Sequence, residues 1–134
     1  MHTCNALIIH CMDFRLMDPI FQYLKERGLT GTCDQVSIAG AIKAIAENPQ
    51  GPEAQVLFKQ IQLSKELHHI ETVILMNHTD CGAYGGRKAY TTLAEEREKH
   101  IADMRAVREY ILTRFSDLSI ETVLADIGVH FITA

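Results

Sequence analysis

Four short apolar runs, separated by segments with helical periodicity, constrain the fold of this chain more than any other feature. The runs are Asn5–His10, Gln35–Ile38, Glu71–Asn77 and Ile120–Ala125. Short apolar runs of this kind are typical of strands that are covered on both faces. Strands that alternate with helices predict an α/β fold with a mostly parallel central sheet of four strands and helices on both faces. Gly128 could turn the chain into a closing strand over Val129–Thr133, which we expect to lie antiparallel at an edge.

Three signals predict where helices begin. The pair Asp18-Pro19 places a capping carboxylate before a proline that suits the first helical position. Pro52 can open a second helix, after which apolar residues recur at helical spacing. Thr92 and Glu95 have the spacing of a capping box and predict a long amphipathic helix that ends near residue 115.

Length and charge limit the classes of protein to which the chain can belong. Its 134 residues are the size of one domain, so we expect a single domain over 1–134. The net charge is −4 and no basic run stands out, which argues against nucleic-acid binding. No stretch approaches the ~20 apolar residues of a membrane span, and the first residues lack the charged region of a signal peptide. We therefore expect a cytoplasmic protein that binds neither nucleic acid nor membrane.

The strongest chemical signal lies in two clusters, each at the end of a predicted strand. Cys11 follows the first apolar run, and His78 and Cys81 follow the third. Parallel strands end at the same edge of a sheet, where ligands bind in such folds. Zinc takes thiolate and imidazole ligands, and a catalytic site keeps a position open beyond three protein ligands. We predict one Zn²⁺ per chain, held by Cys11, His78 and Cys81.

A carboxylate and a guanidinium accompany the first cluster. Asp13 lies two residues from Cys11 and two from Arg15. We expect Arg15 to hold the Asp13 carboxylate in a bidentate pair, so that it is aimed at a metal-bound water. Without that pair, Asp13 could itself become the fourth ligand and close the site. Asp13 and Arg15 are therefore the predicted catalytic residues.

These clusters resemble the motifs of the beta-class carbonic anhydrases, which pair Cys-x-Asp-x-Arg after the first strand with His-x-x-Cys-Gly after the third. The matching residues are Cys11, Asp13, Arg15, His78, Cys81 and Gly82. Further likeness lies at Met12, Leu16, Asp18, Thr79, Asp80 and Ala39-Gly40. The resemblance implies reversible hydration of CO₂ to bicarbonate by attack of a zinc-bound hydroxide, with Asp13 and Arg15 assisting. We also expect a homodimer or higher homo-oligomer with the sites near the interface.

The chain departs from the family around the substrate. Ser37-Ile38 stands where Arg-Asn is usual, and Phe14 stands where a serine is usual. Ten residues precede Cys11, so we expect a minimal prokaryotic-type member without the amino-terminal helices that embrace the partner subunit. Relatives with the same site hydrolyse carbonyl sulfide or carbon disulfide, and a more apolar pocket would suit those substrates as an alternative. The predicted pocket residues are Phe14, Ile38, Ala39, Gly40, Gly82 and Tyr84.

Two rival functions compete with this interpretation. The stretch from Cys81 to Arg87 fits Cys-x5-Arg, the signature of phosphatases in which a thiolate attacks a phosphate cradled by loop amides. Lys88 stands where a hydroxyl residue normally follows the arginine, and this alternative leaves Cys11 and His78 unexplained. The second rival is a non-catalytic zinc module, which the altered pocket residues favour and the retained Asp13 and Arg15 oppose.

The remaining cysteines and most other histidines suggest no chemistry at this level. Cytosolic chains of this size rarely form disulfides, so we interpret Cys4 and Cys33 as small buried or incidental residues. We expect the other histidines outside the clusters, apart from the two nearest the amino terminus, to be helix-surface or strand residues. These are His68, His69, His100 and His130.

Overall fold

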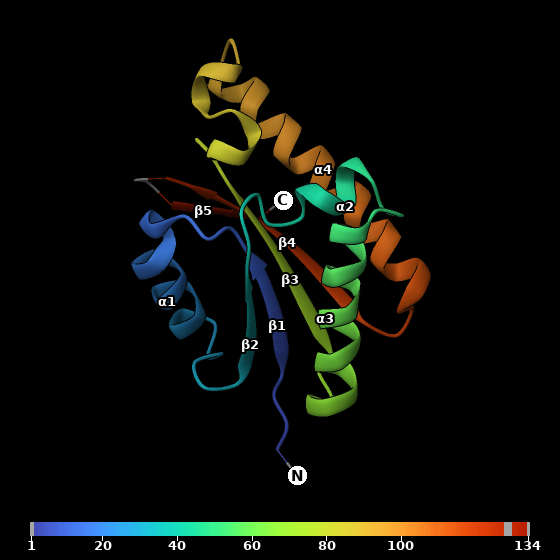
Figure 1. Ribbon diagram of the computed structural model, residues 1–134. Coiled ribbons are helices and arrows are strands. Elements are labelled where there is room, and N and C mark those ends of the chain that lie inside the picture. Colours follow the sequence, from blue (N-terminus) through green and yellow to red (C-terminus); the bar gives the residue numbers. More distant parts are fainter. Residues whose placement is uncertain (1, 128–129, 134) are drawn as a thin grey trace.

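A computed structural model describes residues 2–127 and 130–133, and a five-stranded sheet runs through its centre (Figure 1). The strands are β1 (Ala6–His10), β2 (Cys33–Ser37), β3 (Thr72–His78), β4 (Ser119–Asp126) and β5 (His130–Thr133). Their order is β2-β1-β3-β4-β5; the first four are parallel and β5 runs antiparallel to β4. The predicted α/β class and the antiparallel edge strand are confirmed, although the predicted turn residue Gly128 and the predicted first strand residue Val129 lie outside the described residues.

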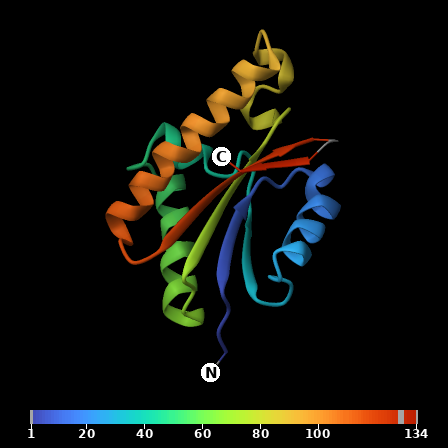
Figure 2. The same cartoon turned by 180° about the vertical axis from the view of Figure 1, so that it is seen from behind.

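Helices cover both faces of the sheet, as predicted. They are α1 (Met17–Glu26), α2 (Lys43–Glu47), α3 (Pro52–His68) and α4 (Leu93–Arg114), and three 3₁₀ turns span Phe14–Leu16, Gly82–Tyr84 and Arg87–Ala89. Seen from opposite sides, α1 lies on one face and α3 and α4 lie on the other (Figures 1 and 2). Alternate residues of β1 divide accordingly: Leu7 and Ile9 pack with the α3 and α4 side, while Ala6 and Ile8 pack with α1. Among the described residues, no helix combines the length and apolar character that a membrane crossing needs.

Two of the three predicted helix starts are confirmed, those at Pro52 and Thr92. Pro52 occupies the first turn of α3, and the Thr92 hydroxyl accepts a hydrogen bond from the Glu95 amide at 3.1 Å. The start at Asp18-Pro19 is wrong, because α1 already begins at Met17 without a side-chain cap. The turn of Phe14–Leu16 leads directly into the helix, and its capping carboxylate belongs to Asp13 instead.

The strand order places the two sequence clusters side by side. The chain adds β2 on one side of β1 and then β3 on the other, so the order switches at β1. Ligands of open parallel sheets bind outside the carboxyl ends of strands at such a switch. His10, the last residue of β1, pairs with Met76, so the loop that follows β1 begins beside the last residues of β3.

Candidate metal centre

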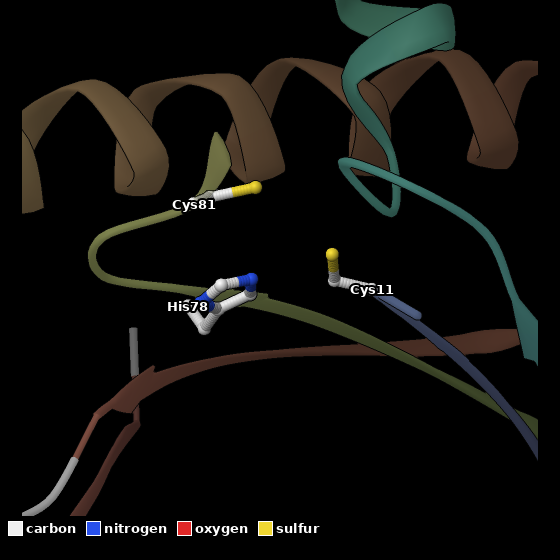
Figure 3. A group of neighbouring side chains, drawn as sticks. All are labelled: Cys11, His78 and Cys81. Carbon is white, nitrogen blue, oxygen red and sulfur yellow. The ribbon is translucent and has the colours of Figure 1, made fainter. Parts of the chain in front are cut away.

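Cys11, His78 and Cys81 meet at the carboxyl ends of β1 and β3. One ligand atom from each residue lies within 4.8 Å of the other two. The three side chains converge on a common space (Figure 3). All three residues are buried, with exposed fractions of 6%, 1% and 2%. Segments almost seventy residues apart thus supply two thiols and one imidazole to a single site.

The hydrogen bonding of His78 leaves one ring nitrogen without a partner. Its Nδ1 lies 2.7 Å from the Thr79 carbonyl oxygen, a contact that requires Nδ1 to carry the proton and donate it. In the neutral ring Nε2 is then the acceptor, and this buried atom has no hydrogen-bond partner within the described part of the chain. An orphaned nitrogen with its tautomer set from the opposite side is the arrangement that metal-binding histidines show. The donor set therefore fits zinc.

The two thiols behave as one titrating pair. A hydrogen bond from Cys81 lowers the pKa of Cys11, while the same contact and burial raise the pKa of Cys81. The Gly40 amide adds a 3.4 Å hydrogen bond to the Cys11 sulfur. One sulfur of the pair therefore carries negative charge most readily, and a divalent cation would favour the loss of the second proton.

The ion pair between Asp13 and Arg15 is present, and it has the bidentate form that the sequence suggested. Arg15 Nη2 donates to Asp13 Oδ2 at 2.7 Å, and Arg15 Nε donates to Asp13 Oδ1 at 3.1 Å. Hydrogen bonds from Arg15 lower the pKa of the Asp13 carboxyl to about 2. Asp13 Oδ2 also lies 3.8 Å from His78 Nε2, which places this carboxylate beside the orphaned nitrogen.

A second carboxylate, that of Asp80 in the loop after β3, also accepts a hydrogen bond from Arg15. Arg15 Nη1 donates to Asp80 Oδ2 at 3.0 Å, and Nη2 donates to the Asp80 carbonyl at 2.9 Å. Asp80 adopts a left-handed φ of 55°, a conformation that aspartate tolerates better than most residues. The resemblance includes Asp80 without giving it a role, and the structure makes it the second anchor of the guanidinium.

Asp80 is in turn held by a glutamate that sequence reasoning missed. The Glu96 carboxylate accepts a 2.6 Å hydrogen bond from the Asp80 amide, and Arg87 Nε lies 3.6 Å from its other oxygen. Glu96 is fully buried, although a charged residue in an amphipathic helix is normally assigned to solvent. A signal was available, since Glu96 lies four and eight residues before His100 and Met104 and so shares their helix face.

His100 is one of the histidines that the sequence placed on a surface, and that expectation is wrong. The residue is fully buried where α4 covers the sheet, and its Nδ1 lies 3.0 Å from Asn77 Nδ2. Burial, aided by the nearby His78, lowers its pKa to about 4. Tyr84 completes the group, because its hydroxyl accepts from Asn77 at 3.1 Å and donates to Asp103 at 2.9 Å.

The predicted pocket residues divide between a hollow and the surrounding core. A hollow of about 610 Å³ opens beside Cys11 and Asp13, and Phe14, Ala39 and Gly82 line it. Its remaining lining residues are Met12, Arg15 and Ala83. The Gly40 amide donates a hydrogen bond to the Cys11 sulfur, and Gly40, Ile38 and Tyr84 do not line the hollow. Ile38 packs against the core on the α3 side, and the Tyr84 hydroxyl accepts a hydrogen bond from Asn77.

A family model described as "Putative carbonic anhydrase" matches residues 1–131. The chain belongs to the carbonic anhydrase family. The family and the fold together indicate an enzyme of the lyase class, similar to carbonate dehydratases.

Solved structures support the same placement. A carbonic anhydrase from Streptococcus mutans superposes with a TM-score of 0.59 at 18% identity, over 98% of this chain and 82% of that one. The β-carbonic anhydrase CafA of Aspergillus fumigatus gives a TM-score of 0.55 at 17% identity, over 99% and 76%. At these identities the likeness establishes the fold, which is that of the beta class.

Two similar sequences have been described without a function. An uncharacterized protein of Rickettsia conorii is 30% identical over 127 residues, which cover 92% of this chain and 68% of that protein. One from Rickettsia bellii is 29% identical over 127 residues and is covered to 77% of its length.

Proposed function

We propose that this protein is a zinc-dependent carbonic anhydrase that catalyses the reversible hydration of CO₂ to bicarbonate. Cys11, His78 and Cys81 would hold one Zn²⁺ per chain. The observation that carries the proposal is the buried convergence of these donors beside a carboxylate that lies 3.8 Å from the orphaned Nε2 of His78. When bound there, zinc supplies a Lewis acid that makes water acidic enough to lose a proton near neutral pH.

Asp13 and Arg15 orient the reacting water in this proposal. With its pKa near 2, the Asp13 carboxyl is ionised at neutral pH and is too weak a base to remove a proton efficiently. Its task is to accept a hydrogen bond from water at Oδ2 and so to set the direction of attack. Arg15, anchored on Asp80, holds the carboxylate in place, so that Asp13 does not itself become a metal ligand.

The hollow suits a small uncharged substrate. Met12, Phe14, Ala39 and Ala83 supply most of its wall, and Arg15 is its one cationic side chain among the described lining residues. CO₂ fits these surroundings, and so do carbonyl sulfide and carbon disulfide. Because the same apolar wall accommodates the sulfur compounds, their hydrolysis is the second candidate function.

The contacts of the glycine loop do not favour phosphatase chemistry. The amides of Tyr84, Gly85 and Gly86 donate to carbonyls within the loop, so they are not available to a bound phosphate. Arg87 is drawn toward Glu96. A non-catalytic zinc module is the more serious rival, since it needs the same three ligands.

The substitution Asp13→Asn tests the proposed function. It removes the negative charge but keeps the size and one acceptor, so CO₂ hydration by the zinc-loaded protein should fall about 100-fold through lost orientation. Zinc content, measured by atomic emission, should not change. Asp18→Asn, which alters an exposed carboxylate nearby, is the control and should retain full activity.

Two outcomes would reject this assignment. Zinc-loaded wild-type protein that hydrates no CO₂ and hydrolyses neither sulfur compound would be a non-catalytic module. Full activity in Asp13→Asn would remove Asp13 from the mechanism. Comparing turnover of CO₂ with that of carbonyl sulfide in the wild-type protein decides between the two substrates.

We further propose that the protein works as a homodimer whose interface includes the outer wall of the site. Four large apolar side chains around the start of α1 are exposed by more than half: Met12, Phe14, Met17 and Phe21. All four line one hollow of about 320 Å³, so they form a continuous surface that association would bury. The double substitution Met17→Glu with Phe21→Glu should convert a dimer to a monomer in sedimentation equilibrium. Val56→Glu, at an exposed position of α3, should not, and a monomeric wild-type protein would refute the proposal.

A reducing compartment is part of the same proposal. All four cysteines are free thiols, and the proposed zinc ligands include two of them. Thiols of this kind persist in the cytoplasm, where disulfides are rare, so we infer a cytoplasmic location. Fractionation of cells expressing the protein would test the inference.

A further inference from the structure

A second group of metal-ligating side chains lies at the opposite end of the sheet. Cys4, Asp34 and His68 each offer one ligand atom, and these atoms lie within 4.8 Å of one another. They come from the segment before β1, from the start of β2 and from the last residue of α3. Figure 1 shows these three places together at the end of the sheet where the strands begin, with β1 separating them from Cys11.

Hydrogen bonds already organise this group. Asp34 Oδ2 accepts from the Ser64 hydroxyl and from His68 Nδ1, both at 2.6 Å. The Cys4 amide donates to the His68 carbonyl at 3.0 Å, which ties the amino-terminal segment to the end of α3. The Cys4 sulfur lies 3.5 Å from the Ala6 carbonyl. It also interacts with Asp34, and burial together with that carboxylate raises the pKa of the Cys4 thiol. A thiol thus stands beside a paired carboxylate and imidazole, and a cation would have to displace its proton.

The group is accessible, and a fourth donor lies close by. The side chains of Asp34 and His68 are 29% and 28% exposed, so an ion can reach them without opening the fold. The ring of His2 lies with its centroid 4.8 Å from that of His68. His2 is not one of the three clustered donors, so its side chain would have to turn to reach the same ion.

We propose that Cys4, Asp34 and His68, completed by His2, form a second binding site for a thiophilic divalent cation, with Zn²⁺ as its ligand. One thiolate, one carboxylate and two imidazoles are a donor set that zinc accepts in tetrahedral geometry. The ion replaces the proton that His68 now shares with Asp34, while Ser64 continues to orient the carboxylate. Cys4 and His68, to which the sequence alone assigned no chemistry, become ligands.

The bound ion would act on the fold. It would join three segments that are about thirty residues apart in sequence. The segment before β1 would then be held against β2 and the end of α3. An ion that binds the folded state alone stabilises it, so zinc should raise the unfolding temperature even when the first centre has been removed. This site does not depend on carbonic anhydrase activity.

Cobalt titration of the full chain tests the proposal, because Co²⁺ bound to thiolate gives a charge-transfer absorption. The wild-type protein should bind two equivalents and the double variant Cys11→Ser with Cys81→Ser should bind one. Adding Cys4→Ser or His68→Gln to that double variant should abolish binding. Cys33→Ser and His69→Asn change a neighbouring thiol and a neighbouring histidine and should leave the second equivalent in place. Circular dichroism of each variant confirms that it is folded.

A comparison within otherwise intact protein keeps the test decisive if the double variant fails to fold. Zinc content after dialysis should fall from two equivalents in the wild-type protein to one in Cys4→Ser. One equivalent in both proteins would overturn the second site and leave the first untouched. If the Cys11→Ser protein instead loses one equivalent of zinc and keeps the other, the result would support both sites.

Discussion

Gly40 offers a sharp test of how the fold builds the proposed metal centre. Its backbone has a φ of +77°, and a Cβ at this position would lie 3.1 Å from both Ala83 Cβ and Lys43 Cβ. Its amide donates to the Cys11 sulfur. Gly40→Ala should therefore strain the backbone, press against two neighbours and disturb one ligand at the same time.

Gly31 separates these effects, because it has the same φ of +77° and no atom within 4 Å of its would-be Cβ. An L-residue in the left-handed region costs about 1–2 kcal/mol, and both alanine variants pay this. Overpacking adds roughly 1–3 kcal/mol, and this applies only to Gly40→Ala. We thus expect unfolding free energies lowered by about 1–2 kcal/mol in Gly31→Ala and about 2–5 kcal/mol in Gly40→Ala.

Urea unfolding of both variants in excess chelator measures these costs without a contribution from metal. Adding Ala83→Gly to Gly40→Ala removes one of the two close contacts, so a double-mutant cycle should show part of the excess recovered. Zinc affinity, measured by competition with a chelating dye, should fall roughly 10- to 100-fold in Gly40→Ala, as for other changes behind a ligand. Gly31→Ala should bind zinc normally. Equal stability and equal zinc affinity in the two variants would refute this account of the Gly40 turn.

Three further predictions concern other contacts. Arg15→Lys cannot form the bidentate pair with Asp13, so CO₂ hydration should fall roughly 10- to 100-fold while zinc content is unchanged; wild-type turnover in this variant would count against orientation by Arg15. Thr92→Ala removes the cap on the Glu95 amide and should lower the unfolding free energy by about 1 kcal/mol in urea titrations, whereas Thr92→Ser should restore it. Because its pKa is lowered from 6.5 to about 4 in the folded state, His100 takes up a proton first in the unfolded chain. Stability should accordingly fall by up to about 3 kcal/mol as the pH drops from about 6.5 to about 4; a His100→Gln variant with the same pH dependence would exclude His100 as the cause.

Much of the architecture could be predicted because its signals are local. The apolar runs of β1 and β3 and the capping pair at the start of α4 are readable from neighbouring residues. The start of α1 was mistaken for the same reason, since Asp18-Pro19 has the local pattern of a cap while the preceding turn continues into the helix. A local sequence pattern does not show whether the neighbouring turn continues into the helix, nor which distant segments the helix contacts.

The sequence by itself determined the identity of the proposed metal ligands. Cys11, His78 and Cys81 stand at the ends of two strands, and parallel strands that are neighbours end at one edge. The residue types and the strand periodicity were sufficient for that inference.

Only the tertiary structure decided how those residues are supported. Glu96, Asp80 and Arg15 form a chain of contacts between α4, the loop after β3 and the turn before α1. Helical spacing can place Glu96 on a particular face of α4, but it does not show that this face meets the Asp80 loop. The same holds for Cys4, Asp34 and His68. The physical reason is that burial and pairing depend on which faces of helices and strands meet, and that is settled by packing of the whole chain.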